Sequence, residues 1–169
     1  MFEPSIHHFN LSEVNDAAFV QRYCRQHKIY FMVYVIKWRN EVLKYGIQHS
    51  VAGNQPGERL YTQIGWMPGW KNGTLKRSQK TGDAVQRLID YVNQKHKTSF
   101  HKDDVSVEVM DYTNFPFFDT KNRYAEMQNF EEHHKKLFNE KEGYYPIGNP
   151  KQEKIRFIPT QFDNLFEFD

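Results

Sequence analysis

Cysteine and long apolar runs are nearly missing from this chain, and each absence limits what the protein can be. Cys24 is the single cysteine, which excludes an internal disulfide and a cysteine cluster for structural zinc. No stretch approaches the roughly 18 apolar residues that a membrane-spanning helix needs. The N-terminus also lacks a basic segment followed by an apolar one. We therefore expect a cytoplasmic protein with no membrane association.

The composition that is present suits one folded domain. Charged residues make up 26% and aromatic residues 16% of the 169 residues, a balance that favours a folded protein over a disordered one. The mean hydropathy of -0.83 indicates a very polar surface. A chain of this length buries roughly two thirds of the surface that its unfolded form exposes, so we expect a single domain over residues 1–169.

The net charge of +2 hides two segments of opposite sign. Residues 59–102 contain nine Lys or Arg and two Asp, which gives +7, whereas residues 103–142 contain ten acids and five bases, which gives -5. This arrangement is typical of a polyanion-binding face beside an acidic or metal-binding region. A solvated surface with uneven charge would produce the same pattern.

Apolar periodicity and turn signals predict four helices and three strands. Spacings of three, four and seven residues indicate helices, and strict alternation indicates strands. In chain order the elements are a helix over about 12–26, a β-hairpin over 31–47, a short helix near Arg59, a helix capped by Asp83, a strand over 105–111 and a long helix over about 119–139 that ends at Gly143. Residues 65–82 show neither period, so we expect a loop there.

The predicted hairpin brings two tyrosines into a geometric relation. If residues 39–40 form a two-residue loop, Trp38 pairs with Glu41 and Tyr34 falls opposite Tyr45. Both phenol rings then share one face of the sheet. Two such rings are costly to keep for packing alone, since each hydroxyl needs a partner when it is buried. The tyrosine pair is therefore a candidate site.

The order of these features resembles that of the GIY-YIG nuclease superfamily. Residues 32–34 (Met-Val-Tyr) resemble the first half of the name motif, and residues 44–46 (Lys-Tyr-Gly) resemble the second half. The resemblance covers roughly residues 29–149. It implies an α+β core in which a small three-stranded antiparallel sheet, the hairpin plus a third strand, is flanked by helices. Residues 1–28 would then be a helical extension, and residues 150–169 a tail packed on the core.

The second half of the motif allows two alignments, because the family usually has Tyr-Ile-Gly there. Aligning on Gly46 makes Lys44 the counterpart of the family tyrosine, whereas aligning on the tyrosine spacing makes it Tyr45. Some members, especially virus-associated ones, resemble Lys-Ile-Gly at this place. Neighbouring strand residues point to opposite faces, so only one of the two enters the site unless a bulge intervenes. We favour Lys44, because a glycine lets the backbone approach a substrate closely.

The resemblance implies hydrolysis of DNA phosphodiester bonds with one divalent cation. Glu126 would hold Mg²⁺ or Mn²⁺ through oxygen ligands, and Arg59 would clamp the scissile phosphate through its planar guanidinium. Tyr34 together with Lys44 or Tyr45 would activate and orient the attacking water. These residue types suit the reaction, which needs a nucleophilic water and neutralisation of developing charge.

Several residues compete for these roles or would support them. Glu131 and Glu132 lie on the same helix as Glu126, which we prefer because it stands one turn before the apolar Phe130. Beyond these, His49 and Asn149 are expected to support the site. His133 and His134 are helical neighbours that diverge by about 100°, so they do not share one metal ion.

The basic loop over residues 65–82 is the expected DNA contact. Its cations would bind phosphates and its indole rings would stack on bases. The candidate DNA-binding residues are Trp66, Trp70, Lys71, Lys76, Arg77 and Lys80.

The sequence thus predicts a hydrolase, a small metal-dependent endodeoxyribonuclease of the phage, mobile-element or restriction type. Its partner would be DNA, and a homodimer would allow one site per chain to cut both strands. The alternative is a nucleic-acid-binding protein that keeps the GIY-YIG fold without catalysis. This alternative would be favoured if Lys44 could not take over the role of the usual tyrosine.

Overall fold

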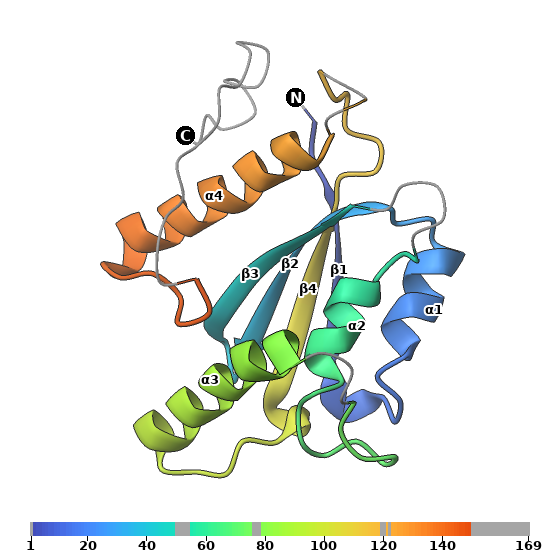
Figure 1. The fold of residues 1–169 in the computed structure, drawn as a ribbon. Helices are drawn as coiled ribbons and strands as arrows, with labels where there is room; N and C mark the ends of the chain where they lie inside the picture. Colours follow the sequence, from blue (N-terminus) through green and yellow to red (C-terminus); the bar gives the residue numbers. More distant parts are fainter. Residues whose placement is uncertain (1, 50–54, 76–78, 119–120, 122, 150–169) are drawn as a thin grey trace.

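A four-stranded antiparallel sheet with helices on both faces forms the core of the chain (Figure 1). The computed structural model describes residues 2–49, 55–75, 79–118, 121 and 123–149, without the side chains of residues 79 and 80. The strands are β1 (Ser5–Asn10), β2 (Phe31–Trp38), β3 (Glu41–His49) and β4 (Val105–Asp111), in the spatial order β1-β4-β2-β3. The helices are α1 (Phe19–Gln26), α2 (Glu58–Ile64), α3 (Gln79–His96) and α4 (Arg123–Glu142), with 3-10 turns at Leu11–Glu13 and Lys102–Asp104.

The two faces of the sheet are covered by different helices. Met32 and Tyr34 of β2 belong to a core built with residues of α1, α2 and α3. Val33 and Val35, which alternate with them, pack on the other face against Phe130 of α4. Because both faces of this central strand are buried, β2 is apolar almost throughout and lacks the polar alternation of a half-exposed strand.

The predicted α+β class is confirmed, but the predicted strand count of three was wrong. Residues Ser5–Asn10, expected in a helical extension, pair antiparallel with β4 and add an edge strand. This strand carries a weak sequence signal, because most of its side chains are exposed and Ile6 is 63% accessible to solvent. The expected helix over 12–26 is a 3-10 turn followed by α1, which begins only at Phe19.

The other helix boundaries differ by a few residues from those expected. The helix predicted from Asp83 begins at Gln79, so the expected loop ends before residue 79. The last helix begins at Arg123 and ends at Glu142, where Gly143 takes a φ of 83° and terminates it as predicted. The tail over 150–169 lies outside the described residues. None of the described helices is long and apolar enough to cross a bilayer.

The hairpin turn has the predicted length. Trp38 pairs with Glu41, and the two residues between them, Arg39 and Asn40, have φ values of 44° and 70°. Positive φ at both central positions is the signature of a type I′ turn, whose twist matches that of the flanking strands. Asn accepts this conformation well, and Arg39 is tied to the 3-10 turn before β4 through a 3.0 Å hydrogen bond from its Nε to Asp104.

A β-bulge in β3 changes the pairing beyond the turn. The register shifts between Ile36, which pairs with Lys44, and Lys37, which pairs with Val42. Tyr34 therefore lies opposite Gly46, so the predicted pairing of Tyr34 with Tyr45 was wrong. The bulge inserts one extra residue on one strand, and the sequence gives no local signal for it.

The bulge places the ring of Tyr34 across Gly46. A Cβ atom added at Gly46 would overlap the Cζ and Oη atoms of Tyr34, whose side chain is only 1% exposed. Because the ring of Tyr34 approaches the backbone so closely, only glycine fits at position 46. The contact directs the phenol hydroxyl past the backbone of the edge strand.

We predict that Gly46→Ala destabilises the protein by about 1–3 kcal/mol, because the new methyl group must displace a fully buried ring. Urea unfolding followed by circular dichroism measures this change. In the double variant Tyr34→Leu/Gly46→Ala the added cost of the alanine should be smaller, since leucine lacks the overlapping ring atoms. Strictly additive effects would contradict the overlap.

Candidate active site

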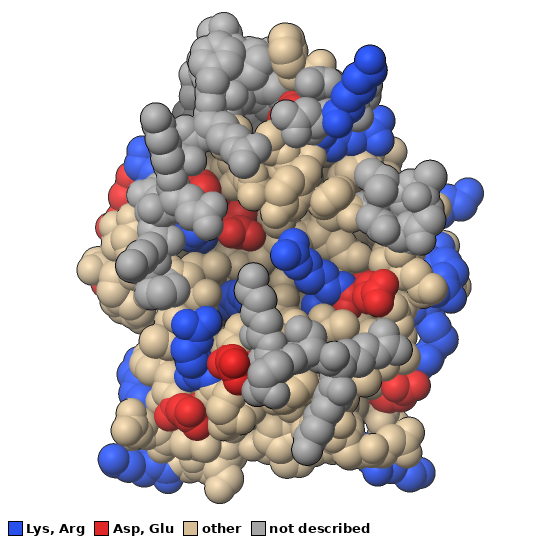
Figure 2. Space-filling view, viewed as in Figure 1, with Lys and Arg blue, Asp and Glu red and all other residues tan. Residues whose placement is uncertain are grey.

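A cavity of about 280 Å³ lies at the edge of the sheet formed by β3. It collects side chains from β2, β3, α2, α4 and the turn after α4, among them Tyr34, Lys44, Arg59, Gln63, Glu131 and Asn149. In Figure 2 basic and acidic surfaces lie close together between α4 and α2. An edge strand permits this meeting, because helices that cover opposite faces of the sheet can both reach its margin.

Tyr34 reaches this cavity from the buried layer of the sheet. Its hydroxyl accepts a hydrogen bond from Nε2 of Gln63, which is itself 6% exposed. Burial raises the pKa of the phenol, and the positive charge of Arg59 opposes this shift. A hydroxyl that accepts from Gln63 keeps its own proton available for donation.

Lys44 lies on the same side of β3 as Gly46, two residues away, and therefore on the side of Tyr34. Burial lowers the pKa of its ammonium group, while the negative charge of Glu131 opposes that shift. A Cβ at Gly148 would lie 2.7 Å from Cβ of Lys44, so the backbone after α4 passes directly over the lysine stem. Lys44, the residue that alignment on Gly46 selects, thus lies in the cavity beside Tyr34.

Arg59 is held in the first turn of α2 by contacts to β3. Its backbone N–H donates to Oε1 of Gln48 at 2.9 Å, and its Nη1 donates to the carbonyl of Ile47 at 3.5 Å. These bonds aim the guanidinium at the strand edge and into the cavity. The predicted short helix near Arg59 is confirmed, and Arg59 is its second residue.

Glu131, and not Glu126, lines the cavity. The carboxylate of Glu126 instead accepts a 2.8 Å hydrogen bond from the backbone N–H of Phe118. Five residues on an α-helix correspond to a rotation of about 140°, so the two glutamates point in different directions. We preferred Glu126 for its place one turn before Phe130, but Phe130 packs under the sheet and not toward its edge, so this relation does not bring Glu126 to the cavity.

Tyr45 also lines this cavity, but its side chain points to the opposite face of the sheet from Tyr34. Its ring stacks on that of His134 with centroids 5.8 Å apart and planes 17° apart. Its backbone meets Asn149, whose Oδ1 accepts from Tyr45 N–H at 2.6 Å and whose Nδ2 donates to the Tyr45 carbonyl at 3.0 Å. Asn149 therefore pairs with the edge of β3 as another strand would, and it lines the cavity.

His49 lies beside Arg59 on the rim of a neighbouring cavity of about 300 Å³. Its ring centroid is 4.7 Å from that of Tyr124, a residue of the first cavity. Burial and the charge of Arg59 both lower the pKa of His49. The histidine thus neighbours the site, as expected, without lining the same cavity.

The two tryptophans of the expected DNA-binding loop are used for packing. Trp70 is 7% exposed, donates from Nε1 to the Ile64 carbonyl at 2.8 Å and lies 4.6 Å below the ammonium of Lys102. Trp66 packs so closely on Gly82 of α3 that a Cβ there would overlap its ring. Neither ring forms the open stacking platform that we predicted.

The cations of that loop are only partly described. Lys71 is exposed on the turn before residue 76. Lys76 and Arg77 lie outside the described residues. Lys80 belongs to the first turn of α3, although its side chain is not described. The prediction that these four cations contact DNA stays a prediction.

Gln63 is a residue of this cavity that sequence reasoning missed. It stands four residues after Arg59, so the two share one face of α2. This i, i+4 relation was the available signal, but a single glutamine in a short helix does not identify its partner. Contact with Tyr34 follows from tertiary packing of α2 on the sheet.

Glu131 supplies the only carboxylate among the described residues that line the cavity. In the described part of the chain, no three His, Cys, Asp or Glu side chains are grouped so that they could hold a metal ion. Mg²⁺ commonly keeps several waters and takes one or two carboxylates together with substrate phosphate oxygens. A single glutamate beside two cations fits that mode of binding and does not fit a cage made of protein ligands alone.

No protein-family model matches this chain, and neither a curated protein nor a solved structure matches it. Function is therefore inferred from the cavity and its chemistry.

We predict that His134 makes folding stability depend on pH. Burial, reinforced by His133, lowers the pKa of His134 from 6.5 to about 4. Between these pH values the unfolded chain binds more protons than the folded one. The contribution of neutral His134 to the free energy of unfolding is therefore fully present above pH 6.5 and is lost as the pH falls toward 4. The loss from this group is about 2–3 kcal/mol.

Urea unfolding at pH 7 and at pH 4.5 tests this dependence. His134→Phe keeps a ring against Tyr45 and should lose less stability than the wild type on acidification. His8→Phe, at an exposed position of β1, serves as the matched control and should behave as the wild type. An unchanged pH dependence in His134→Phe would show that His134 accepts its proton without cost in the folded state.

Proposed function

We propose that this protein is a metal-dependent endonuclease that hydrolyses phosphodiester bonds in DNA through a GIY-YIG-type site. The observation that carries this proposal is the convergence of Tyr34, Lys44, Arg59 and Glu131, from four different elements, on one cavity at the sheet edge. Phosphodiester hydrolysis needs an activated water, a phosphate clamp and neutralisation of the leaving oxygen. These four side chains provide the corresponding chemical groups.

The charge of the cavity favours a phosphate. Lys44 and Arg59 face a single carboxylate, that of Glu131, so an anion finds a net positive environment. The guanidinium of Arg59 offers parallel donors that match two oxygens of a phosphate. Backbone contacts to β3 hold that guanidinium in place before substrate arrives, which reduces the ordering cost of binding.

Lys44 is the better candidate for the general base. Burial acts in opposite directions on the two groups: it raises the pKa of Tyr34 and lowers the pKa of Lys44. A neutral amine is therefore more accessible than a phenolate near neutral pH. In this assignment Lys44 accepts the proton of the attacking water, and Tyr34, oriented by Gln63, donates a hydrogen bond to the water or to a phosphate oxygen.

Glu131 would hold the divalent cation, Mg²⁺ or Mn²⁺. When bound, such a cation supplies Lewis-acid neutralisation of the charge that develops on the phosphate. The remaining ligands would be waters and substrate oxygens, since the cavity offers one protein carboxylate among the described residues.

A non-catalytic nucleic-acid-binding protein with the same fold is the second candidate. The observation in its favour is the lysine that stands where a GIY-YIG site usually has its second tyrosine. Such a protein would bind plasmid DNA and leave it supercoiled. An active dimer would linearise the plasmid, whereas an active monomer would nick it.

We predict that Glu131→Gln abolishes cleavage of supercoiled plasmid in the presence of Mg²⁺ or Mn²⁺, because the amide cannot replace the carboxylate as a cation ligand. Glu126→Gln should cut at nearly the wild-type rate, since its side chain binds the backbone of Phe118. Agarose gels that resolve supercoiled, nicked and linear DNA provide the measurement, with EDTA as the control for metal dependence.

Circular dichroism of both glutamate variants separates loss of chemistry from loss of fold. Cleavage that depends on Glu126 and not on Glu131 would transfer the metal site to the first turn of α4. Wild-type protein that leaves the plasmid supercoiled with either cation would refute the nuclease proposal.

A further prediction concerns the proton acceptor. Lys44→Ala should lower the single-turnover cleavage rate by the ~10²- to 10⁴-fold typical of a general base. Tyr45→Phe should change it little, because this ring lies on the other face of β3. Lys44→Arg should remain slow, since a guanidinium keeps its proton at any accessible pH. DNA binding of each variant is measured in parallel. Full activity of Lys44→Arg would show that the side chain at position 44 acts through its positive charge and not as a general base.

A further inference from the structure

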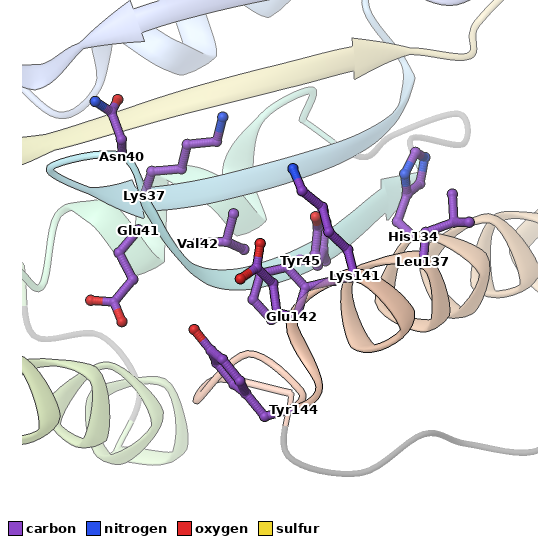
Figure 3. A pocket seen from close by; sticks show the side chains of 11 residues that line it. Lys37, Asn40, Glu41, Val42, Tyr45, His134, Leu137, Lys141, Glu142 and Tyr144 are labelled. Atoms are coloured by element: carbon purple, nitrogen blue, oxygen red, sulfur yellow. The ribbon is translucent and has the colours of Figure 1, made fainter.

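A second cavity, of about 540 Å³, lies between the turn end of the hairpin and the C-terminal half of α4 (Figure 3). Its volume is within the range of sites that hold small planar ligands. The hairpin contributes Lys37, Glu41 and Tyr45, α4 contributes His134 and Phe138, and Tyr144 follows the helix. No role in the proposed chemistry uses this cavity.

Aromatic rings form one wall of this cavity. The ring of Phe138 lies edge-on to Tyr45, with centroids 6.4 Å apart, and edge-on to Tyr144, with centroids 5.4 Å apart. His134 stacks on Tyr45 from the same helix. Tyr144 is 46% exposed, unlike most rings of the protein, and so keeps a face open to a ligand. Aromatic walls of this kind favour a flat, π-bonded partner.

The charges around this cavity are largely balanced. The ammonium of Lys37 lies 2.9 Å from the carboxylate of Glu108. Glu41 is paired with Lys95 and His96 of α3, and residues 141–142 add one lysine and one glutamate. Balanced charge gives little attraction for a phosphate, whereas polar groups at the rim can still hydrogen-bond the edge of a heterocycle.

This cavity adjoins the candidate active site through β3. Tyr45 lines both cavities, and its neighbour Lys44 belongs to the active-site cavity. A DNA strand with one phosphate at the active-site cavity therefore passes within reach of the aromatic wall.

We propose that this aromatic cavity binds one unstacked nucleobase of the DNA strand whose phosphate occupies the active-site cavity. The proposal rests on the proposed nuclease function. Phosphate recognition and base recognition are then divided between the two faces of β3. Stacking of a base on aromatic side chains tolerates any sequence, because every base has a π face.

Binding of two single-stranded probes in the presence of EDTA tests the proposal without cleavage. One probe is a fluorescein-labelled oligothymidylate, and the other is an abasic strand of equal length with the same phosphates. By fluorescence anisotropy the wild-type protein should bind the first ~5- to 150-fold more tightly, the equivalent of 1–3 kcal/mol for a stacked base. Tyr144→Ala should remove most of this preference, and Tyr144→Phe should keep it.

Tyr30→Ala is the matched control. Tyr30 is 37% exposed, close to the 46% of Tyr144, but does not line the cavity, so its removal should leave the preference unchanged. Equal affinities of the wild type for both probes, no binding of either, or a preference that survives Tyr144→Ala would overturn the proposal.

The same probes separate this proposal from the nuclease proposal. Glu131→Gln should retain the base preference while it fails to cut plasmid. A wild-type protein that cuts plasmid without a base preference would contradict only the base site. A protein that shows the preference but never cuts would contradict only the nuclease function.

Discussion

The contact between Tyr34 and Gly46 determines the geometry of the candidate site. The tyrosine ring crosses the edge strand at the one residue that lacks a Cβ, and the bulge in β3 brings that residue opposite it. With a regular ladder from the turn, Tyr45 would lie there instead and its side chain would enter the space now taken by the ring. The bulge therefore decides both where the phenol hydroxyl emerges and which neighbour, Lys44 or Tyr45, shares its side of the strand.

The position of β3 at the sheet edge explains how distant segments meet. A central strand separates the helices on its two faces, whereas an edge strand allows residues of α2 and α4 to line one cavity at the same margin. Edge strands also expose unpaired backbone groups that invite association with other chains. Asn149 and the N–H of Gly148, which donates to the Leu43 carbonyl at 2.8 Å, satisfy several of these groups. The segment that protects the edge thus also closes one wall of the cavity.

Local patterns predicted those parts of the fold in which side-chain periodicity and burial agree. The strand Val105–Asp111 has the expected bounds, since Val105, Val107 and Val109 all face one core. The strand Ser5–Asn10 could not be recognised, because most of its side chains are exposed and its place in the sheet depends on pairing with the distant β4. For the site, Tyr34, Lys44 and Arg59 were identified from motif order. Whether Glu131 and Gln63 face the cavity depends on the rotation of their helices and on tertiary packing. An error of one residue in the predicted helix phase rotates each side chain by about 100° and hides this.

The close approach of Gly148 to Lys44 offers a physical reason for a lysine at this position. The backbone at Gly148 passes so near the Cβ and Cγ atoms of Lys44 that a side chain at 148 would collide with them. A lysine stem is thin and flexible, and it can pass beneath that backbone while its amine reaches the cavity. A phenol ring is wide and rigid from Cγ onward, so a tyrosine would require the 148–149 segment to move away from β3 and to give up the Asn149 bonds. Lysine at 44 and glycine at 148 therefore both suit one close contact at the sheet edge, beside the hydrogen bonds that join Asn149 to the backbone of Tyr45.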